Sequence, residues 1–214
     1  LILAPELAEA QTYSITFTVT GLPAGVSSHY YLDGVLNGTI TTGDTKTLDL
    51  SPGIIHTISV DLNVGGGNGT RYQCGDNVWS FSGGGVHTFT YKTQYYLTVT
   101  SPYDSPTPTS GWFDAGTSVT ASVTSPYTGP IGSRYVCTGW TGTGSTPSSG
   151  TDKTVTFTIN QPSSLTWNWK TQYYLMVGTD PTGIATILGE GWYDPSANIT
   201  LTAPTVSGYA FTNW

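Results

Sequence analysis

The feature that most constrains the fold is an internal repeat with a period of about 77 residues. Three short motifs recur in the same order, 74 to 80 residues apart: residues 92–97 (KTQYYL) with 170–175, residues 111–114 (GWFD) with 191–194 (GWYD), and residues 134–140 (RYVCTGW) with 208–214 (GYAFTNW). This spacing exceeds the roughly 20–50 residues of solenoid repeats. It suits a small β-sandwich of under about 100 residues, so we expect a tandem of such modules.

The repeat divides the chain into four predicted parts: an N-terminal extension (1–12), module 1 (13–92), module 2 (93–170) and a partial module 3 (171–214). Module 1 shares only its later half with the others. Modules 1 and 2 each end in an alternating segment that runs directly into KTQYYL, so no flexible linker is expected at Lys92 or Lys170. Modules joined in this way are expected to form a stiff rod.

Composition and periodicity both indicate an all-β protein. Charged residues make up only 9% of the chain, whereas aromatic residues reach 13%. Alternation of apolar and polar residues predicts strands over residues 13–20, 117–124, 153–159 and 197–202. The Asp33-Gly34 pair predicts the turn of a hairpin over residues 29–36. We therefore expect each module to be an antiparallel β-sandwich.

Charge and composition also exclude some partners and favour a location. Six Lys and Arg against thirteen Asp and Glu give a net charge of −7, which the phosphates of nucleic acid would repel. No run approaches 18 apolar residues, so no helical membrane span is expected. Low charge and abundant hydroxyl groups are common in extracellular proteins. Sequons at Asn37, Asn68 and Asn198 are candidate N-glycosylation sites and favour the cell surface.

The first ten residues, LILAPELAEA, contain no threonine, glycine or aromatic residue and so differ from the rest of the chain. Three interpretations stay open: the tail of a signal peptide cut before Gln11, an edge strand on its own module, or a strand lent to a neighbouring copy. In the last interpretation the candidate assembly strand is formed by Leu1, Ile2, Leu3, Leu7 and Ala8.

Module 3 stops at Trp214, which aligns with Trp140 of module 2. The segments TVTFTI and SLTWNW, which come after Trp140, have no counterpart after Trp214. Either the gene continues or another chain completes the sandwich. A strand donated head-to-tail by a second copy would fill the gap, and a head-to-tail contact that does not close into a ring builds a filament.

No motif indicates catalysis, a cofactor or a metal. His29, His56 and His87 stand outside any zinc-ligand pattern, and the chain has no G-x-S-x-G elbow. Asp114 and Asp194 occupy the same place in the repeated motif, where a carboxylate is expected to close a turn, with a calcium ion as the alternative. We predict no catalytic, cofactor-binding or metal-binding residues.

Tryptophan and cysteine recur at equivalent positions. Trp112, Trp140 and Trp192 are expected to be buried in module cores, and a sugar-binding platform is the alternative. Cys74 and Cys137 both stand in an Arg-Tyr-x-Cys sequence. A disulfide between them and a pair of free buried thiols are equally open, and neither thiol is expected to be exposed and reactive.

These residues resemble the tandem Ig-like β-modules of large archaeal and bacterial surface proteins. YSITFTVTGLPAG (13–25) resembles the opening of Ig-like modules in thermopsin-type and other archaeal secreted proteins, and KTQYYLTV, GWFDAGTSV and RYVCTGWTGTGS resemble the adjoining repeat module. The resemblance covers nearly the whole chain after Gln11. It implies Ig-like sandwiches of the kind found in stalks, spacers, surface layers and filaments, and it carries no catalytic residue.

Three functions are compatible with these features. We favour a non-enzymatic structural protein of the cell surface, a filament or stalk subunit whose partners are copies of itself. The first alternative is an adhesin or carbohydrate-binding region, with surface glycans as partners. The second is a set of accessory modules belonging to a larger secreted enzyme. No cofactor is expected in any of the three.

Overall fold

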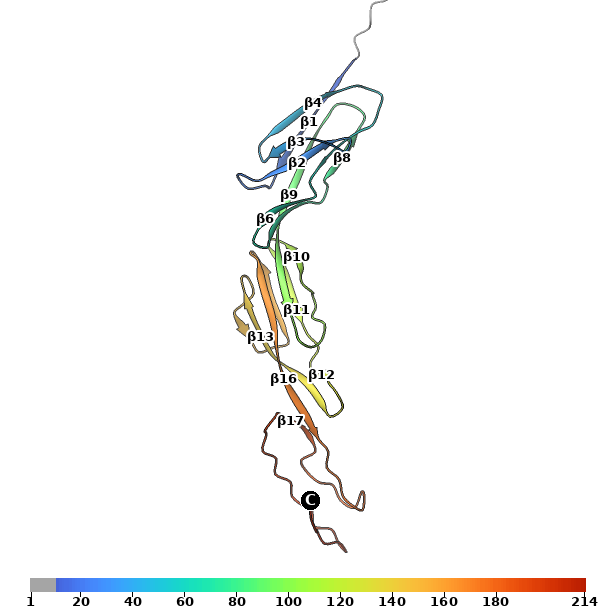
Figure 1. The fold of residues 1–214 in the computed structure, drawn as a ribbon, viewed down its shortest axis with the longest axis vertical. Helices are drawn as coiled ribbons and strands as arrows, with labels where there is room; N and C mark the ends of the chain where they lie inside the picture. Colours follow the sequence, from blue (N-terminus) through green and yellow to red (C-terminus); the bar gives the residue numbers. More distant parts are fainter. Residues whose placement is uncertain (1–10) are drawn as a thin grey trace, which may run out of the picture. The chain divides into compact units, whose positions relative to one another are not determined.

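The computed structural model describes residues 11–214, which contain seventeen strands and no helix (Figure 1). It therefore has no helix over these residues that is long and apolar enough to cross a membrane. The chain forms two compact units: residues up to 97, 112–117 and 159–162 belong to the first, and residues 98–111, 118–158 and 163–214 to the second. The module limits at Lys92 and Lys170 stay predictions.

Two sheets form the body of unit 1. One contains β1 (Tyr13–Thr20), which pairs with β4 (Thr45–Leu50) and with the first part of β9 (Gly85–Thr100). The other has the order β3 (Val35–Thr41), β2 (Ser27–Leu32), β5 (His56–Val60) and β8 (Val78–Phe81). Further along, β9 pairs with β7 (Thr70–Cys74), which forms a hairpin with β6 (Asn63–Gly67).

The expectation of purely antiparallel sandwiches is wrong for unit 1. Strands β1 and β9 are parallel, with Ile15 opposite Gly85 and Thr20 opposite Thr90. Parallel strands need a long crossover between them, and here the other strands of the unit supply it. The alternation of apolar and polar residues is compatible with parallel and with antiparallel pairing, because both place every second residue on the core face.

The core of unit 1 lies between its two sheets. Ile15, Phe17 and Val19 of β1 are fully buried, and they belong to one cluster with Ile40 and Ile58 of the facing sheet. The alternate residues of β1 are a serine and three threonines on the outer face, where the hydroxyl oxygens of Thr18 and Thr88 are 3.0 Å apart. The predicted Asp33-Gly34 turn is confirmed, with φ of 50° and 80° between β2 and β3.

Unit 2 is built around the long pair of β13 (Ser133–Thr143) and β16 (Ser163–Leu175). Short strands β12 (Tyr127–Thr128) and β14 (Ser149–Gly150) flank β13, while β17 (Gly191–Tyr193) pairs with β16. A separate pair joins β11 (Thr117–Ser122) to β15 (Thr154–Ile159). Strand β10 (Gly111–Asp114), which apart from Gly111 belongs to unit 1, pairs with β9.

Strand β13 has a bulge between Cys137 and Gly139, where the backbone of Gly150 in β14 lies very close to it. Gly139 has φ of 121°, and a Cβ there would lie 1.9 Å from the Gly150 carbonyl oxygen. Trp140 is the next residue and lies directly on the backbone of Gly150. Only glycine fits at both positions, so this close approach buries the Trp140 indole.

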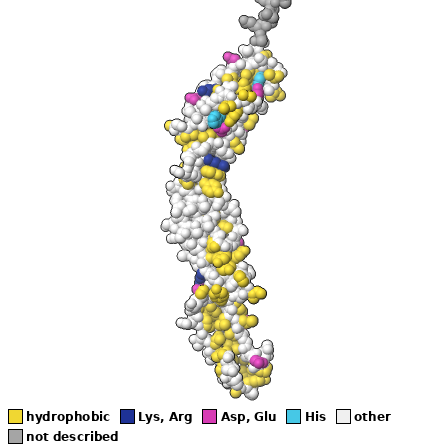
Figure 2. Space-filling view, viewed as in Figure 1, with side chains coloured by type: hydrophobic (Ala, Val, Ile, Leu, Met, Phe, Trp, Pro, Cys, Tyr) yellow, Lys and Arg dark blue, Asp and Glu magenta, His cyan; other side chains and the backbone are white. Residues whose placement is uncertain are grey.

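The segment after β16 forms far less regular structure than its sequence predicted. Residues 197–202 are not a strand, which contradicts the prediction from their alternation. Between Met176 and Trp214 only β17 is regular. Hydrophobic side chains gather over this part of the visible surface, while charged side chains are sparse (Figure 2).

Candidate functional site

The repeated motifs form one side-chain network in unit 1. Arg71 Nε donates to Gln94 Oε1 at 2.8 Å, and Gln94 Nε2 donates to Asp114 Oδ1 at 2.7 Å. Lys92 Nζ lies 3.4 Å from the other oxygen of Asp114. The Arg71 guanidinium also stands 4.6 Å from the centre of the Trp112 ring, within the range of a cation–π contact. The Gln94 carboxamide thus links an arginine to a carboxylate.

Strand periodicity explains why the motifs have this spacing. Residues two apart on a strand face the same side. In KTQYYL the same face therefore carries Lys92, Gln94 and Tyr96, and in GWFD it carries Trp112 and Asp114. The β7–β9 register places Arg71 opposite Gln94. Three strands thereby bring together residues that are far apart in the sequence.

Unit 2 contains the same network with nearly the same geometry. Arg134 Nε donates to Gln172 Oε1 at 2.9 Å, and Gln172 Nε2 donates to Asp194 Oδ1 at 2.8 Å. Lys170 Nζ lies 2.6 Å from Asp194 Oδ2, and Arg134 stands 4.6 Å from the centre of the Trp192 ring. The hydrogen bond from Lys170 and, to a smaller extent, the one from Gln172 lower the pKa of the Asp194 carboxyl below its ordinary value.

The networks correct two expectations about the repeated residues. The carboxylates of Asp114 and Asp194 bind lysine and glutamine instead of closing a turn. Trp112 and Trp192 are half-buried, and each contacts an arginine and the ring of Tyr96 or Tyr174, so of the three predicted tryptophans only Trp140 is a buried core residue. The sequence motifs marked these positions, but sequence reasoning missed the arginine–glutamine–aspartate connection.

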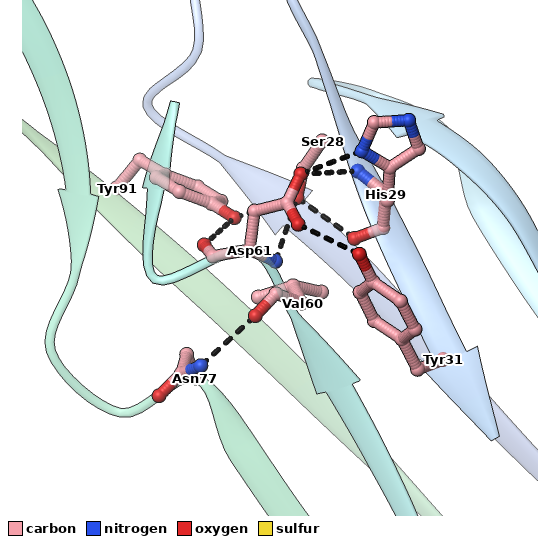
Figure 3. Close-up of polar contacts among 7 residues, drawn as sticks. All are labelled: Ser28, His29, Tyr31, Val60, Asp61, Asn77 and Tyr91. Atoms are coloured by element: carbon pink, nitrogen blue, oxygen red, sulfur yellow. Dashed lines mark hydrogen bonds and ion pairs between the residues drawn. The ribbon is translucent and has the colours of Figure 1, made fainter. Parts of the chain in front are cut away.

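A second polar cluster in unit 1 surrounds Asp61, just after β5 (Figure 3). The Asp61 carboxylate accepts hydrogen bonds from the backbone amide of His29 at 2.9 Å and from the Tyr31 hydroxyl at 3.1 Å, and His29 Nδ1 lies 2.8 Å away. Burial opposes ionisation of Asp61, but these hydrogen bonds prevail and lower its pKa. The same carboxylate raises the pKa of Tyr31.

Ser28, His29 and Asp61 are the residue types of a hydrolase triad, but their geometry is structural. Ser28 is fully buried, and its hydroxyl accepts from the Asp61 amide at 3.1 Å and donates to the His29 carbonyl at 2.9 Å. It also lies 2.7 Å from Tyr91 Oη, which donates to the Asp61 carbonyl at 2.6 Å. Burial raises the pKa of Tyr91 to about 12, so this hydroxyl keeps its proton. The cluster ties β2 and β5 to β9.

The remaining predicted residues are distributed over both units. Cys74 and Cys137 are free thiols, the first buried and the second half-buried, so the structure takes the unbonded alternative. Asn37, Asn68 and Asn198 are all exposed, as a glycosylation site requires. The assembly strand predicted for Leu1, Ile2, Leu3, Leu7 and Ala8 lies outside the described residues.

Two of the three histidines pair with an aspartate, and the third stacks on a tryptophan. His56 Nδ1 lies 2.7 Å from Asp33 Oδ2, and His87 stacks on Trp79 with 5.1 Å between ring centres. Over residues 11–214, no three side chains of His, Cys, Asp or Glu gather into a group that would hold a metal ion.

One cavity of about 400 Å³ lies in the segment after β16. Its apolar lining comes from Ile184, Ile187, Val206, Tyr209, Phe211 and Trp214. The last three side chains are exposed, with 54%, 58% and 64% of their surface accessible. This volume is within the usual range of ligand sites, which is about 300–1,000 Å³.

Comparison with protein-family models, with curated proteins and with solved structures gave no match, so the resemblance to tandem Ig-like surface modules stays an expectation.

Proposed function

We propose that the chain belongs to a non-enzymatic structural protein of the cell surface, in which tandem Ig-like β-modules form a filament or stalk. The observation that carries this proposal is the duplicated network. Four of the six Lys and Arg residues of the chain are committed to it: Arg71, Lys92, Arg134 and Lys170. Most of the few cationic side chains of this chain therefore stabilise the pairing of its strands, as expected of a structural protein.

Each network lies at a predicted module boundary, next to Lys92 or Lys170. The arginine–glutamine and glutamine–aspartate hydrogen bonds each involve a charged partner, which makes them stronger than neutral hydrogen bonds; they are part-buried except Gln172–Asp194, which is exposed and contributes less. The exposed lysine–aspartate pairs contribute little, because water screens them. Together they hold the strands at each boundary in register, and this supports a stiff connection between modules. In the filament form of the proposal, residues 1–10 of one copy add a strand to the next copy.

Carbohydrate binding is the second candidate, because one observation favours it. Tyr209, Phe211 and Trp214 present exposed aromatic surface around the 400 Å³ cavity. Aromatic faces of this kind stack on sugar rings. The structural role is favoured because an arginine covers one face of the Trp112 and Trp192 rings at the network positions, and a tyrosine contacts each ring edge-on.

Small-angle X-ray scattering of the full chain tests the structural role. A Gln94→Ala/Gln172→Ala variant loses the central link of both networks, so its scattering should show a more flexible particle than that of the parent chain. Gln11→Ala, at an exposed position, is the matched control. Identical scattering profiles for all three proteins would contradict a stiffening role.

A glycan array separates the two candidates. The structural proposal predicts no saturable binding of a defined glycan. Saturable binding that Trp214→Ala abolishes and the Gln94→Ala/Gln172→Ala variant retains would establish carbohydrate recognition instead.

A further inference from the structure

Each unit carries a small group of tyrosine and threonine side chains on the sheet face opposite its network, which we call the tyrosine platform. In unit 1 the β7–β9 register places Thr70 opposite Tyr95 and Tyr72 opposite Thr93. These side chains face away from the network glutamine, because neighbours along a strand point to opposite faces. The platform of unit 2 lies on β13 and β16 in the same register and consists of Ser133, Tyr135, Thr171 and Tyr173.

The central tyrosine has the same surroundings in both platforms. A Cβ built on Gly66 would lie 3.0 Å from Tyr72 Cε2, and a Cβ built on Gly129 would lie 3.2 Å from Tyr135 Cε2. Gly129 and Tyr135 each stand 63 residues after their counterparts. Both rings therefore lie with the same edge against a glycine, so the two platforms can be compared ring by ring.

In unit 2 a ring of the chain itself covers the platform. Tyr103 stacks on Tyr135 with 3.6 Å between the ring centres and 8° between the ring planes. It also contacts Trp169 edge-on, with 5.9 Å between the ring centres. The structure thus shows which group this platform takes: a flat aromatic ring that lies parallel to the central tyrosine.

In unit 1 a groove stands in the place of the stacked ring. Residues 18–23 (TVTGLP) precede residues 98–103 (TVTSPY) by 80 positions, so Pro23 holds the place of Tyr103. The groove has a volume of about 620 Å³, and Leu22, Pro23 and all four platform residues line it. Every residue that lines it is uncharged. Such a lining favours a neutral ring, because it offers no partner to a buried charge.

We propose that this groove of unit 1 binds a tyrosine side chain of a partner polypeptide, whose ring stacks on Tyr72 as Tyr103 stacks on Tyr135. The partner presents its tyrosine on a turn, as the segment SPYDS (101–105) presents Tyr103. The inference rests on the duplicated platform and does not depend on the filament or stalk role.

Nuclear magnetic resonance of the full chain, labelled at its threonine methyl groups, tests the proposal with the peptide TSPYDSP, the sequence of residues 100–106. We expect saturable shifts of the Thr70 and Thr93 signals, because a stacked aromatic ring shifts the resonances of nearby methyl groups. Thr171 should not respond, because Tyr103 covers its platform. The control peptide TSPADSP lacks the ring and should shift none of the three signals.

Three variants locate the binding. Pro23→Tyr places a ring of the chain in the groove and should weaken peptide binding about ten-fold or more, whereas the matched control Pro23→Ala should bind like the parent chain. Both are compatible with folding, because Pro23 is exposed. Tyr103→Ala uncovers the platform of unit 2, so the Thr171 signal should then shift with the peptide as well.

The proposal is overturned if TSPADSP gives equal shifts, or if Thr70 and Thr93 show no saturable shift. Normal binding by Pro23→Tyr, or an unchanged Thr171 signal in Tyr103→Ala, would also overturn it. Saturable shifts of Thr70 and Thr93 with methyl mannoside and not with TSPYDSP would give the groove to a saccharide instead. None of these outcomes alters the scattering test of the networks, so the two proposals fail independently.

Discussion

The two copies of the network use the same residues in different surroundings. Gln94 is buried, and its Nε2 also donates to Gln73 Oε1 at 2.7 Å. Gln172 is half-buried, and Val136 occupies the position equivalent to Gln73. The copy in unit 2 instead has a hydrogen bond from Tyr174 to Glu190 at the surface. The motif therefore sets the geometry, while the residues around it set the burial.

A second difference lies in the segment that comes after each network. After Asp114 the chain forms β11, β13, β15 and β16, and residues on the inner face of these strands, such as Val119, Trp140 and Trp167, are buried. After Asp194 it forms no further strand within the described residues. The same alternating pattern thus produces strands only where partner strands are present, because an isolated strand leaves its backbone hydrogen bonds and its apolar face unsatisfied.

The largest expected effect is on the free energy of unfolding, and it compares a buried tryptophan of unit 2 with the exposed tryptophan of the segment after Asp194. Trp167→Ala removes a fully buried indole opposite Trp140 and should lower the free energy of unfolding by about 3–5 kcal/mol. Trp214→Ala, at the position that aligns with Trp140, should change it by less than about 0.5 kcal/mol, because Trp214 is exposed. Urea denaturation followed by circular dichroism measures both. Equal losses would mean that the segment 197–214 is packed in solution.

A smaller difference in stability is expected between substitutions of the two network glutamines, Gln94 and Gln172. Gln94→Ala leaves Arg71, Asp114 and Gln73 without their shared partner, at a cost of about 1–3 kcal/mol. Gln172→Ala exposes its two partners to water, so its cost should be under about 1 kcal/mol. The comparison uses calorimetric unfolding of the full chain. A cost for Gln172→Ala that matches or exceeds that for Gln94→Ala would show that burial does not distinguish the networks.

A single substitution should give the network of unit 2 the additional glutamine that the network of unit 1 contains. Val136→Gln introduces in unit 2 the glutamine that Gln73 supplies in unit 1. A new hydrogen bond to Gln172 should stabilise unit 2 by about 0.5–1 kcal/mol. Val136→Thr, which is polar but too short to reach Gln172, serves as the control. Stabilisation in the threonine variant alone would exclude the proposed hydrogen bond.

The smallest effect is a pH dependence in the second network. Because Lys170 and Gln172 lower the pKa of folded Asp194 below 3.8, its contribution to stability is complete above pH 3.8 and is lost as the pH falls through the lower folded value. The urea midpoints of the parent chain and Asp194→Asn should therefore differ at pH 6 and converge at lower pH. High salt should reduce the difference, because the pair is exposed. A constant difference down to pH 2.5 would contradict this assignment.

Local structure was largely predictable from the sequence. The strand predicted for residues 13–20 is β1 with the same limits, and the strands predicted for 117–124 and 153–159 correspond to β11 and β15 within two residues at each end. Period-two alternation and the Asp-Gly turn depend only on neighbouring residues, so they can be read from the chain.

Long-range pairing was not predictable in the same way. Nothing in the alternation distinguishes a parallel from an antiparallel partner for β1, and the pairing joins residues 70 positions apart, such as Ile15 and Gly85. The networks were also missed as units, although their motifs are visible in the sequence, because repetition of a tryptophan suggests a core residue. Only the structure shows arginine covering the Trp112 and Trp192 rings.

The parallel pairing of β1 and β9 has a mechanical consequence for unit 1. Tension that enters at Tyr13 pulls β1 backward along its axis, and tension that leaves beyond Thr90 pulls β9 forward along the same axis. The two strands are then sheared against each other, so all the hydrogen bonds between residues 15–20 and 85–90 bear the load at once. An antiparallel pair loaded at adjacent ends would instead open one bond at a time. Unit 1 is therefore built to resist stretching along the chain, and single-molecule pulling from its two ends would measure the force at which β1 and β9 separate.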